Sequence, residues 1–325
     1  MKRIFTLFAI LLSCSSIYSQ LFVNEIDSDT DSFDELEFLE IKSESPNFSL
    51  DGYIVVFFNG SASGSDSSYL TLDLDGFQTD VNGLFLIGNN NVSPSAQLII
   101  PNSSIQNGAD AVAIYQSSID DFPNSTLATT VNLIDALAYD TSDSDDDNLM
   151  LLLGLSYQIN ENENGNKTIE SIQRANDGSY FIASPTPREV NEGNGVFLNG
   201  INFSFNQESY YEGDQIEIIF TTEIPVEETI TILFNLDYEN FDSSDYSNVD
   251  SVTFDVDQDS VIVNIDIVDD DIDEGDEDFM LSLSIEDENY LLLNNNSIVR
   301  VNDNDFIVAN YGTPVDPTYN NVTND

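Results

Sequence analysis

The chain of 325 residues contains no histidine, no tryptophan and one cysteine, and only seven of its residues are lysine or arginine. Without histidine, no imidazole is available as a general base. The single cysteine, Cys14, lies in the N-terminal segment, so the remaining chain has no disulfide and no thiol nucleophile. After residue 20, no apolar run is long enough to span a membrane.

The few basic residues are outnumbered by 60 aspartates and glutamates, which gives a formal net charge of −53. Such a chain repels the phosphates of nucleic acids and anionic lipids, and it attracts divalent cations. We therefore expect no nucleic-acid binding. Because 41% of the residues are hydrophobic, the composition is too apolar for a disordered acidic tail and predicts folded domains with acidic surfaces.

The N-terminal segment has the pattern of a bacterial signal peptide. Lys2 and Arg3 precede a short apolar run at residues 4–12, and small polar residues follow up to Ser19. We expect cleavage after Ser19, with lipid attachment at Cys14 as the alternative. Either route predicts a protein that is secreted to the extracellular space or held at the outer cell surface.

The remaining apolar segments are short, alternate with polar residues and end at Asn, Asp, Gly or Pro. Residues 149–153 fit either a helical turn or a buried strand. The pattern predicts an all-β fold of two immunoglobulin-like antiparallel β-sandwiches in tandem. The strands are expected at residues 53–58, 84–87, 111–115, 215–221, 229–234, 251–256, 261–268, 279–285 and 298–301.

Clusters of proline, glycine and polar residues mark the domain boundaries. One lies at residues 184–195, and the composition changes again after residue 306. We expect a signal peptide (1–19), a first domain (20–190), a linker (191–200), a second domain (201–305) and an extended tail (306–325).

The first domain carries L-F-V-N-E-I at 21–26, E-F-L-E-I at 37–41, G-L-F-L-I-G at 83–88 and L-I-D-A-L-A-Y at 133–139. These segments resemble the lamin tail domain, an immunoglobulin-like module of secreted bacterial proteins, such as those of Bacteroidetes-type bacteria. Alternation predicts that Glu25, Glu37 and Glu40 line the face opposite the core or the strand ends. A catalytic pair of Glu25 and Glu37 is the disfavoured alternative.

Two acidic loops of this domain are further candidates for calcium sites. Residues 27–31 alternate like the start of an EF-hand, but Ser32 and Phe38 stand where the motif needs glycine and glutamate. The other loop contains Asp143 and residues 145–147. Both are predicted to be solvated turns.

The strongest functional signal is the run of residues 269–279, in which eight of eleven residues are carboxylates. Such charges repel one another unless water or a cation separates them. Calcium takes roughly 6–8 oxygen ligands, which packed carboxylates supply. A solvated acidic loop is the alternative reading of the run alone. The alternating Asp255, Asp257 and Asp259 are expected to form only a hairpin turn.

The run stands in a context that resembles the Calx-beta family, the calcium-binding sandwich of sodium–calcium exchangers and of many bacterial surface proteins. The matching features are the pairs Glu212-Gly213 and Asp245-Tyr246, the strands at 251–256 and 261–268, and the ending N-D-N-D at 302–305. Asn304 stands where calcium-binding members often have a third aspartate. The resemblance implies Ca²⁺ as the ligand and a metal-binding set of Glu212, Asp245, Asp269, Asp270, Ile272 (through its carbonyl), Glu274, Glu277, Asp303 and Asp305.

These features predict a non-enzymatic, calcium-binding surface or secreted protein with a structural, adhesion or spacer role. Its expected partners are calcium ions and an extracellular-matrix or cell-surface protein or glycan. The alternative rests on residues 311–319, which resemble the linker before a secreted endonuclease I-type domain. On that hypothesis the chain is the accessory portion of a nuclease whose catalytic domain lies beyond Asp325.

Overall fold

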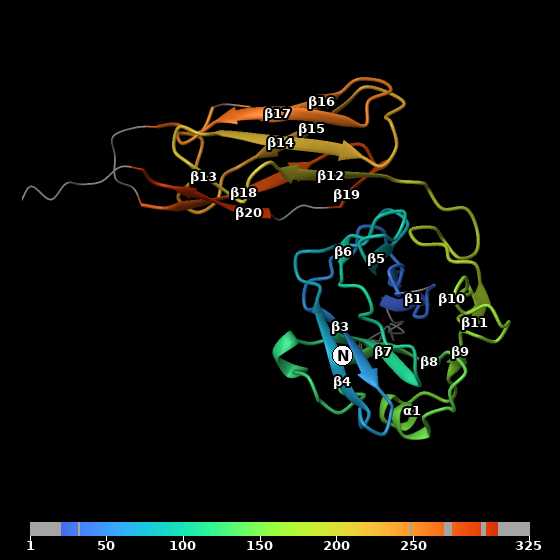
Figure 1. The fold of residues 1–325 in the computed structure, drawn as a ribbon. Coiled ribbons are helices and arrows are strands. Elements are labelled where there is room, and N and C mark those ends of the chain that lie inside the picture. The colour runs from blue at the N-terminus through green and yellow to red at the C-terminus, as the bar shows by residue number, and fades with distance from the viewer. Residues whose placement is uncertain (1–20, 32, 248, 270–274, 294–296, 305–325) are drawn as a thin grey trace, which may run out of the picture. The chain divides into compact units, whose positions relative to one another are not determined.

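The computed structural model describes residues 21–31, 33–247, 249–269, 275–293 and 297–304. The chain divides into two compact units, one ending at Phe197 and the other beginning at Leu198. Both are built almost entirely from strands, so the all-β prediction is confirmed (Figure 1). Within the described ranges, neither helix is long and apolar enough to cross a membrane. The expected signal peptide and the tail at 306–325 lie outside these ranges.

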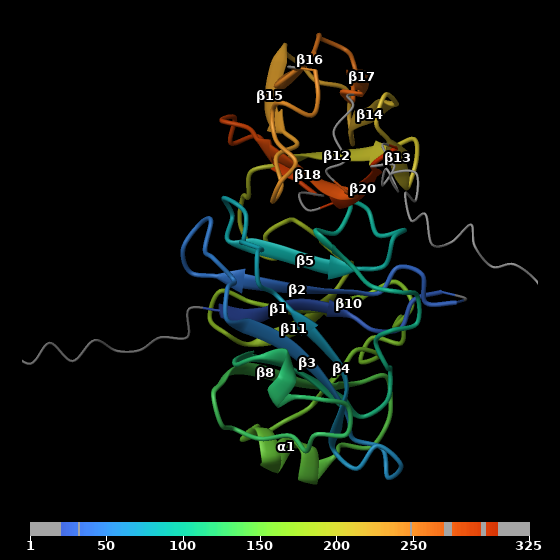
Figure 2. The ribbon, with the colours of Figure 1, turned by 90° about the vertical axis from the view of Figure 1, so that its left-hand side faces the viewer.

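The first unit contains two sheets. Their strand orders are β11-β10-β1-β2-β5-β6 and β4-β3-β7-β8-β9, and the strands of the first sheet lie side by side in Figure 2. The elements in chain order are β1 (Leu21–Asp27), β2 (Phe38–Ser43), β3 (Tyr53–Asn59), β4 (Ser67–Asp73), β5 (Leu84–Gly88), β6 (Leu98–Ile99), β7 (Asp110–Gln116), η1 (Ile119–Asp121), β8 (Leu133–Asp140), α1 (Asp147–Leu153), β9 (Ile159–Asn160), β10 (Ser171–Arg174) and β11 (Tyr180–Ala183).

The strands of the first unit are covered on both faces. One face of β3 and β7 packs into the core between the sheets through side chains such as Val55 and Val112. The opposite face, including Val56, packs against Leu149 and Leu153 of α1. Residues 149–153 are therefore helical, which the sequence left open. The packing of α1 on this face explains why most of β7 is buried along its length instead of alternating. In the other sheet, Val92 and Ala96 cover Leu86 of β5 on the face away from the core, so β5 is also buried throughout.

Two glutamates that alternation assigns to the face opposite the core are also buried, because the segment after β11 covers them. Glu25 and Glu40 oppose each other on β1 and β2, and both side chains are fully buried. Glu25 accepts hydrogen bonds from Ser171 Oγ at 2.6 Å and from Thr186 N at 2.8 Å, while Glu40 accepts one from Arg188 N at 2.7 Å. The two carboxylates thus fasten the segment after β11 across the sheet face that alternation predicts to be solvated.

The prediction of a solvated turn at residues 27–31 is wrong for most of the loop. Asp27, Ser28, Asp29 and Thr30 are buried, and only Asp31 is exposed. Glu37, at the other end of this connection, is also fully buried. In the second acidic loop most aspartates, including Asp143, are exposed, as a solvated turn requires.

The second unit is a sandwich with strand orders β17-β14-β12-β19 and β13-β20-β18-β15-β16. Its strands alternate as the sequence predicts: successive residues of β15 are buried and exposed in turn. The elements are β12 (Asn199–Phe205), β13 (Ser209–Tyr211), β14 (Gln215–Thr222), β15 (Ile230–Asn235), β16 (Ser251–Phe254), β17 (Ser260–Asp266), β18 (Glu277–Ser284), β19 (Tyr290–Leu292) and β20 (Ser297–Asn302).

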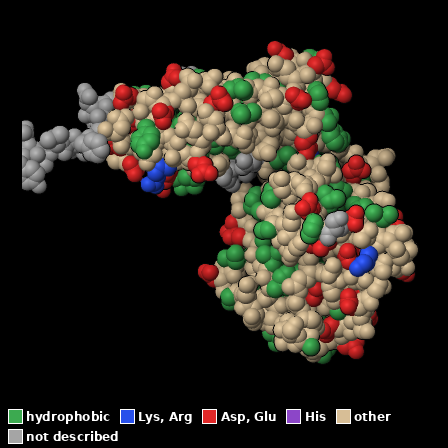
Figure 3. Space-filling model, viewed as in Figure 1, with side chains coloured by type: hydrophobic (Ala, Val, Ile, Leu, Met, Phe, Trp, Pro, Cys, Tyr) green, Lys and Arg blue, Asp and Glu red, His purple; other side chains and the backbone are tan. Residues whose placement is uncertain are grey.

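The buried positions of both sheets form one core, in which Phe279 contacts the rings of Phe205, Tyr210 and Phe241. Outside the cores, aspartate and glutamate side chains are spread over the visible face, where few basic side chains appear (Figure 3). The surface is acidic, as the composition predicts.

Candidate metal centre

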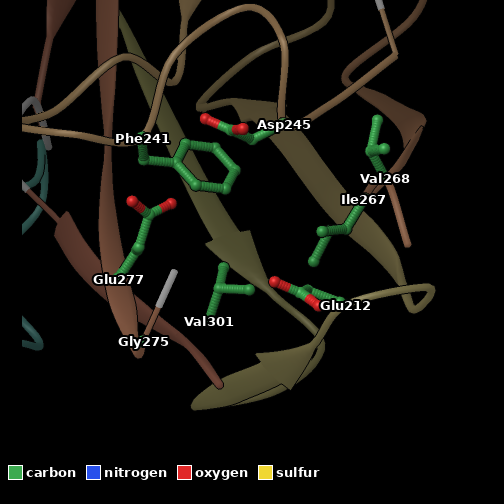
Figure 4. Close-up of a pocket in the computed structure, with 8 residues that line it drawn as sticks. All are labelled: Glu212, Phe241, Asp245, Ile267, Val268, Gly275, Glu277 and Val301. Atoms are coloured by element: carbon green, nitrogen blue, oxygen red, sulfur yellow. The ribbon is translucent and has the colours of Figure 1, made fainter. Parts of the chain in front are cut away.

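Several strand connections of the second unit meet around one small pocket. Glu212 follows β13, Asp245 lies in the connection from β15 to β16, and Glu277 begins β18. Figure 4 shows these three carboxylates arranged around the same space, with the Phe241 ring and Val301 between them. The cavity volume is about 10 Å³, roughly the room that one water-sized sphere needs.

The pocket has an apolar floor that the sequence did not reveal. Phe241 is only 1% exposed and stacks on Tyr246 with ring centroids 5.6 Å apart and planes 7° apart. Ile267 and Val301, both buried, also line the space. Since apolar side chains lower the local dielectric constant, a cation there would interact with carboxylates more strongly than in water.

Backbone hydrogen bonds hold the converging connections together. Val268 N donates to Asp245 O at 2.8 Å, and Ile267 N donates to Asp214 O at 2.9 Å. A β-bridge between Tyr246 and Ile267 adds to these contacts. The main chain itself therefore brings the segments with Glu212, Asp245 and Asp269 to one end of the sandwich.

Asp269 and Asp303 are placed by contacts with the same segments. The Asn304 side-chain amide donates to Asp269 Oδ1 at 3.3 Å and to the Glu212 carbonyl at 3.1 Å. Gly275 N donates to Asp303 Oδ2 at 2.7 Å. Asn304 thus links the main chain of Glu212 to the carboxylate of Asp269, two of the predicted ligand residues.

The backbone conformation at residue 213 explains why a glycine follows Glu212. Gly213 has a φ of 78°, in the left-handed region that residues with a Cβ rarely adopt. A Cβ added there would lie 3.3 Å from Cβ of Asp269. Glycine therefore allows the backbone beside Glu212 to approach Asp269 closely.

No basic side chain lines this pocket among the residues that the structure describes. After residue 198, the sequence contains one basic residue, Arg300. Its guanidinium binds Asp278 with two hydrogen bonds, at 2.9 and 3.2 Å, and lies 3.6 Å from Asp276. This contact lowers the pKa of Asp278. Arg300 is therefore paired with these two surface carboxylates and does not line the pocket.

Of the nine predicted ligand residues, five are described and lie in these converging segments: Glu212, Asp245, Asp269, Glu277 and Asp303. The other four, Asp270, Ile272, Glu274 and Asp305, lie outside the described residues. As the described side chains stand, no three acidic groups surround a common point closely enough to hold a metal. The ligand roles therefore stay a prediction, although the oxygen-only donor set suits a hard cation such as calcium.

Residues 199–305 match the family model described as the Calx-beta domain. Among solved structures, the apo-form Calx CBD1 domain is similar to this chain at 19% identity, with a TM-score of 0.27, covering 32% of this chain and 98% of the other. A structure titled calcium binding domain CBD12 of CALX1.1 is 18% identical, with a TM-score of 0.26, and 45% of its length is covered. Among curated proteins, none matches. The family match, together with the nearly all-β structure, identifies residues 199–305 as a Calx-beta domain.

Proposed function

We propose that the chain is a secreted or cell-surface protein without enzymatic activity, whose Calx-beta domain binds calcium and is stiffened by it. The observation that carries this proposal is the meeting of Glu212, Asp245 and Glu277, from three separate connections, around one pocket with no basic side chain among its described lining residues. Structures titled as Calx calcium-binding domains, although distant, are in keeping with it.

The chemistry of the site follows from charge and ligand type. Glu212, Asp245, Asp269, Glu277 and Asp303 would supply carboxylate oxygens, and water would complete the shell of roughly 6–8 ligands that calcium prefers. Bound calcium cancels the repulsion between these groups, so the connections that carry them become more rigid. Its proposed role is therefore structural.

A rigid sandwich suits adhesion or spacing at the cell surface. The signal-peptide pattern of residues 1–19 supports export, and extracellular calcium would keep a site of even modest affinity occupied. Extracellular modules often bind calcium at about 10⁻⁴–10⁻³ M. We therefore infer an extracellular-matrix or cell-surface protein or glycan as the macromolecular partner.

Calorimetric titration of the full chain with calcium tests the proposal. Asp245→Asn/Asp269→Asn removes two carboxylates from the site and should weaken its affinity for calcium more than about tenfold, since even residues behind metal ligands contribute 10–100-fold. Equal titration curves for the variant and the parent would refute the site.

A matched control lies at the other end of β17. Asp255 and Asp259 are exposed and occupy the connection from β16 to β17. Asp255→Asn/Asp259→Asn changes the net charge by the same amount as the test variant. It should leave the calorimetric titration unchanged, so a loss of binding in this control would mean that total charge, and not the pocket, attracts the cation.

A further inference from the structure

A second group of carboxylates lies inside the first unit, where β1 ends and β2 begins. Asp27, the last residue of β1, pairs with Phe38 of β2, so Glu37 is next to this pair. Glu161 follows β9, and its carboxylate accepts hydrogen bonds from Ser28 N at 3.0 Å and Ser28 Oγ at 2.6 Å. Asp27 is 4% exposed, and Glu37 and Glu161 are 0% exposed. Three segments distant in sequence thus bring carboxylates into the interior.

Two carboxylate oxygens in this group have no hydrogen-bond partner: Asp27 Oδ1 and Glu37 Oε1. The other oxygen of Glu37 accepts hydrogen bonds from Ser104 N at 2.9 Å and Ile105 N at 3.4 Å. The nearby Asn89 amide donates to the Pro101 carbonyl at 2.9 Å, and its interaction with Glu37 lowers the pKa of that carboxyl only in part. Buried polar atoms are nearly always hydrogen-bonded, because an unpaired one costs free energy. Two unpaired oxygens in one cluster therefore point to a missing ligand.

The cluster is also short of positive charge. Burial raises the pKa of Asp27 well above its usual value, and Glu161, Glu25, Glu37 and Asp29 each raise it further. Burial likewise raises the pKa of Glu37 to about 7 and that of Glu161 to about 8.

The nearby base does not relieve this shortage. Lys167 forms an ion pair with Asp29, whose side chain is 10% exposed, while the Lys167 side chain itself is 35% exposed. One partly exposed ammonium group offsets only part of the negative charge of the cluster.

We propose that Asp27, Glu37 and Glu161 bind a hard divalent cation of the Ca²⁺ type, at a site in the first unit that is separate from the Calx-beta pocket. The cation would bind the two unpaired oxygens, Asp27 Oδ1 and Glu37 Oε1. In the described part of the chain no three acidic groups yet surround one point at ligand distance, so the side chains must rotate inward on binding. Water and main-chain carbonyls would complete the shell.

A solvent-open cleft of about 320 Å³ borders the same loops and provides a route for the ion. Its lining includes Asp34, Ile105 and Asn107. Ile105 N is a donor to Glu37, and the Asn107 amide donates to Asp29 Oδ2 at 3.3 Å. The cleft and the buried cluster thus share a wall, and movement of that wall would admit a hydrated cation.

The test uses the full chain with Asp245→Asn/Asp269→Asn as the background, so that the Calx-beta pocket does not contribute. In this background we expect a remaining calcium-binding event in calorimetry. Calcium should also slow hydrogen exchange of the amides at residues 28–30 and 104–105. Adding Asp27→Asn/Glu37→Gln should weaken the remaining affinity more than about tenfold. No calcium binding in the background, or unchanged binding after the addition, would overturn the proposal.

Thermal unfolding separates ligand loss from simple damage. In chelator, Asp27→Asn/Glu37→Gln should melt no lower than its background, because the amides have nearly the size of the carboxyls that they replace, and it should lose the rise that calcium causes. A variant damaged in its fold would melt at a lower temperature in both conditions. Glu35→Gln, an exposed change in the same connection, should leave both melting temperatures unchanged. If the background does not fold, Asp27→Asn/Glu37→Gln in the parent chain should lower the calcium stoichiometry by one, and an unchanged stoichiometry would overturn the proposal.

Discussion

Removal of calcium should destabilise the Calx-beta domain by an amount that its size and site allow to be estimated. A ligand that binds only the folded state stabilises it by about 2.7 kcal/mol when its concentration is 100 times its Kd. For a domain of roughly 100 residues, each kcal/mol shifts the melting temperature by about 4–8 °C. A saturated site should therefore raise the transition of this unit by about 10–20 °C.

Differential scanning calorimetry of the full chain, in excess calcium and in chelator, measures this shift. Because the chain forms two compact units, the transition of the second unit is assigned by its response to Asp245→Asn/Asp269→Asn. This variant should show a clearly smaller calcium-dependent shift than the parent, because a tenfold loss of affinity roughly halves the stabilisation at 100 times the parent Kd, and it should melt above the parent in chelator, since fewer carboxylates repel one another. A parent transition that calcium leaves in place, or a variant that still responds fully, would refute the reasoning.

Three further predictions concern the scaffold. Burial raises the pKa of Glu25 and Glu40, so the folded state holds more protons than the unfolded chain above about pH 4.5, and the free energy of unfolding should fall as pH rises. Glu40→Gln should flatten this slope in urea unfolding between pH 5 and 8, and an unchanged slope would contradict the assignment. Phe279→Ala should cost about 3–5 kcal/mol in denaturant unfolding, against less than about 0.5 kcal/mol for the exposed Leu233→Ala. Asp146→Ala, which removes the N-cap of α1, should cost about 1 kcal/mol by the same measurement, and no loss would show that the cap is dispensable.

The strands of the second unit could be predicted because one face of each sheet meets the core and the other meets water. Residues 215–221 were predicted, and β14 covers Gln215–Thr222 with alternating burial. The strand ends were less accurate, since alternation continues into turns. Residues 251–256 were predicted as a strand, but β16 ends at Phe254, and Asp257 adopts a φ of 69° in the turn that follows.

The first unit shows where this reasoning stops. Alternation assigns Glu25 and Glu40 to the face opposite the core, but it does not reveal that the segment after β11 covers that face. The hydrogen-bond donors that stabilise the buried carboxylate of Glu25, such as Ser171 and Thr186, lie about 150 residues away from it in sequence. The helix at 147–153 had a local signal in Asp146 at its N-cap and Gly154 at its C-cap, which could have decided what periodicity could not.

The predicted calcium ligands fall between these cases. The resemblance to the Calx-beta family, carried by the motif pairs and the acidic run, selected Glu212, Asp245 and Asp269, and their convergence agrees with the rule that strand connections at one end of a sandwich come together. The apolar floor formed by Phe241 was not predictable, since its position depends on stacking with Tyr246. The convergence was thus readable from the sequence, while the dielectric environment of the site was not.

In a chain with few basic residues, a buried carboxyl group can be stabilised by neutral hydrogen-bond donors, by a bound proton or by a metal ion. Glu25 and Glu40 combine two of these: they accept hydrogen bonds from the covering segment, and burial also raises the pKa of both carboxyls. Asp27 and Glu37 each have an oxygen without such a donor, which leaves the proton and the metal as alternatives. A metal must displace the protons, so its affinity should rise with pH through the pKa of Glu37, about 7. A calcium titration repeated at pH 6 and pH 8 should therefore change the affinity of the site in the first unit.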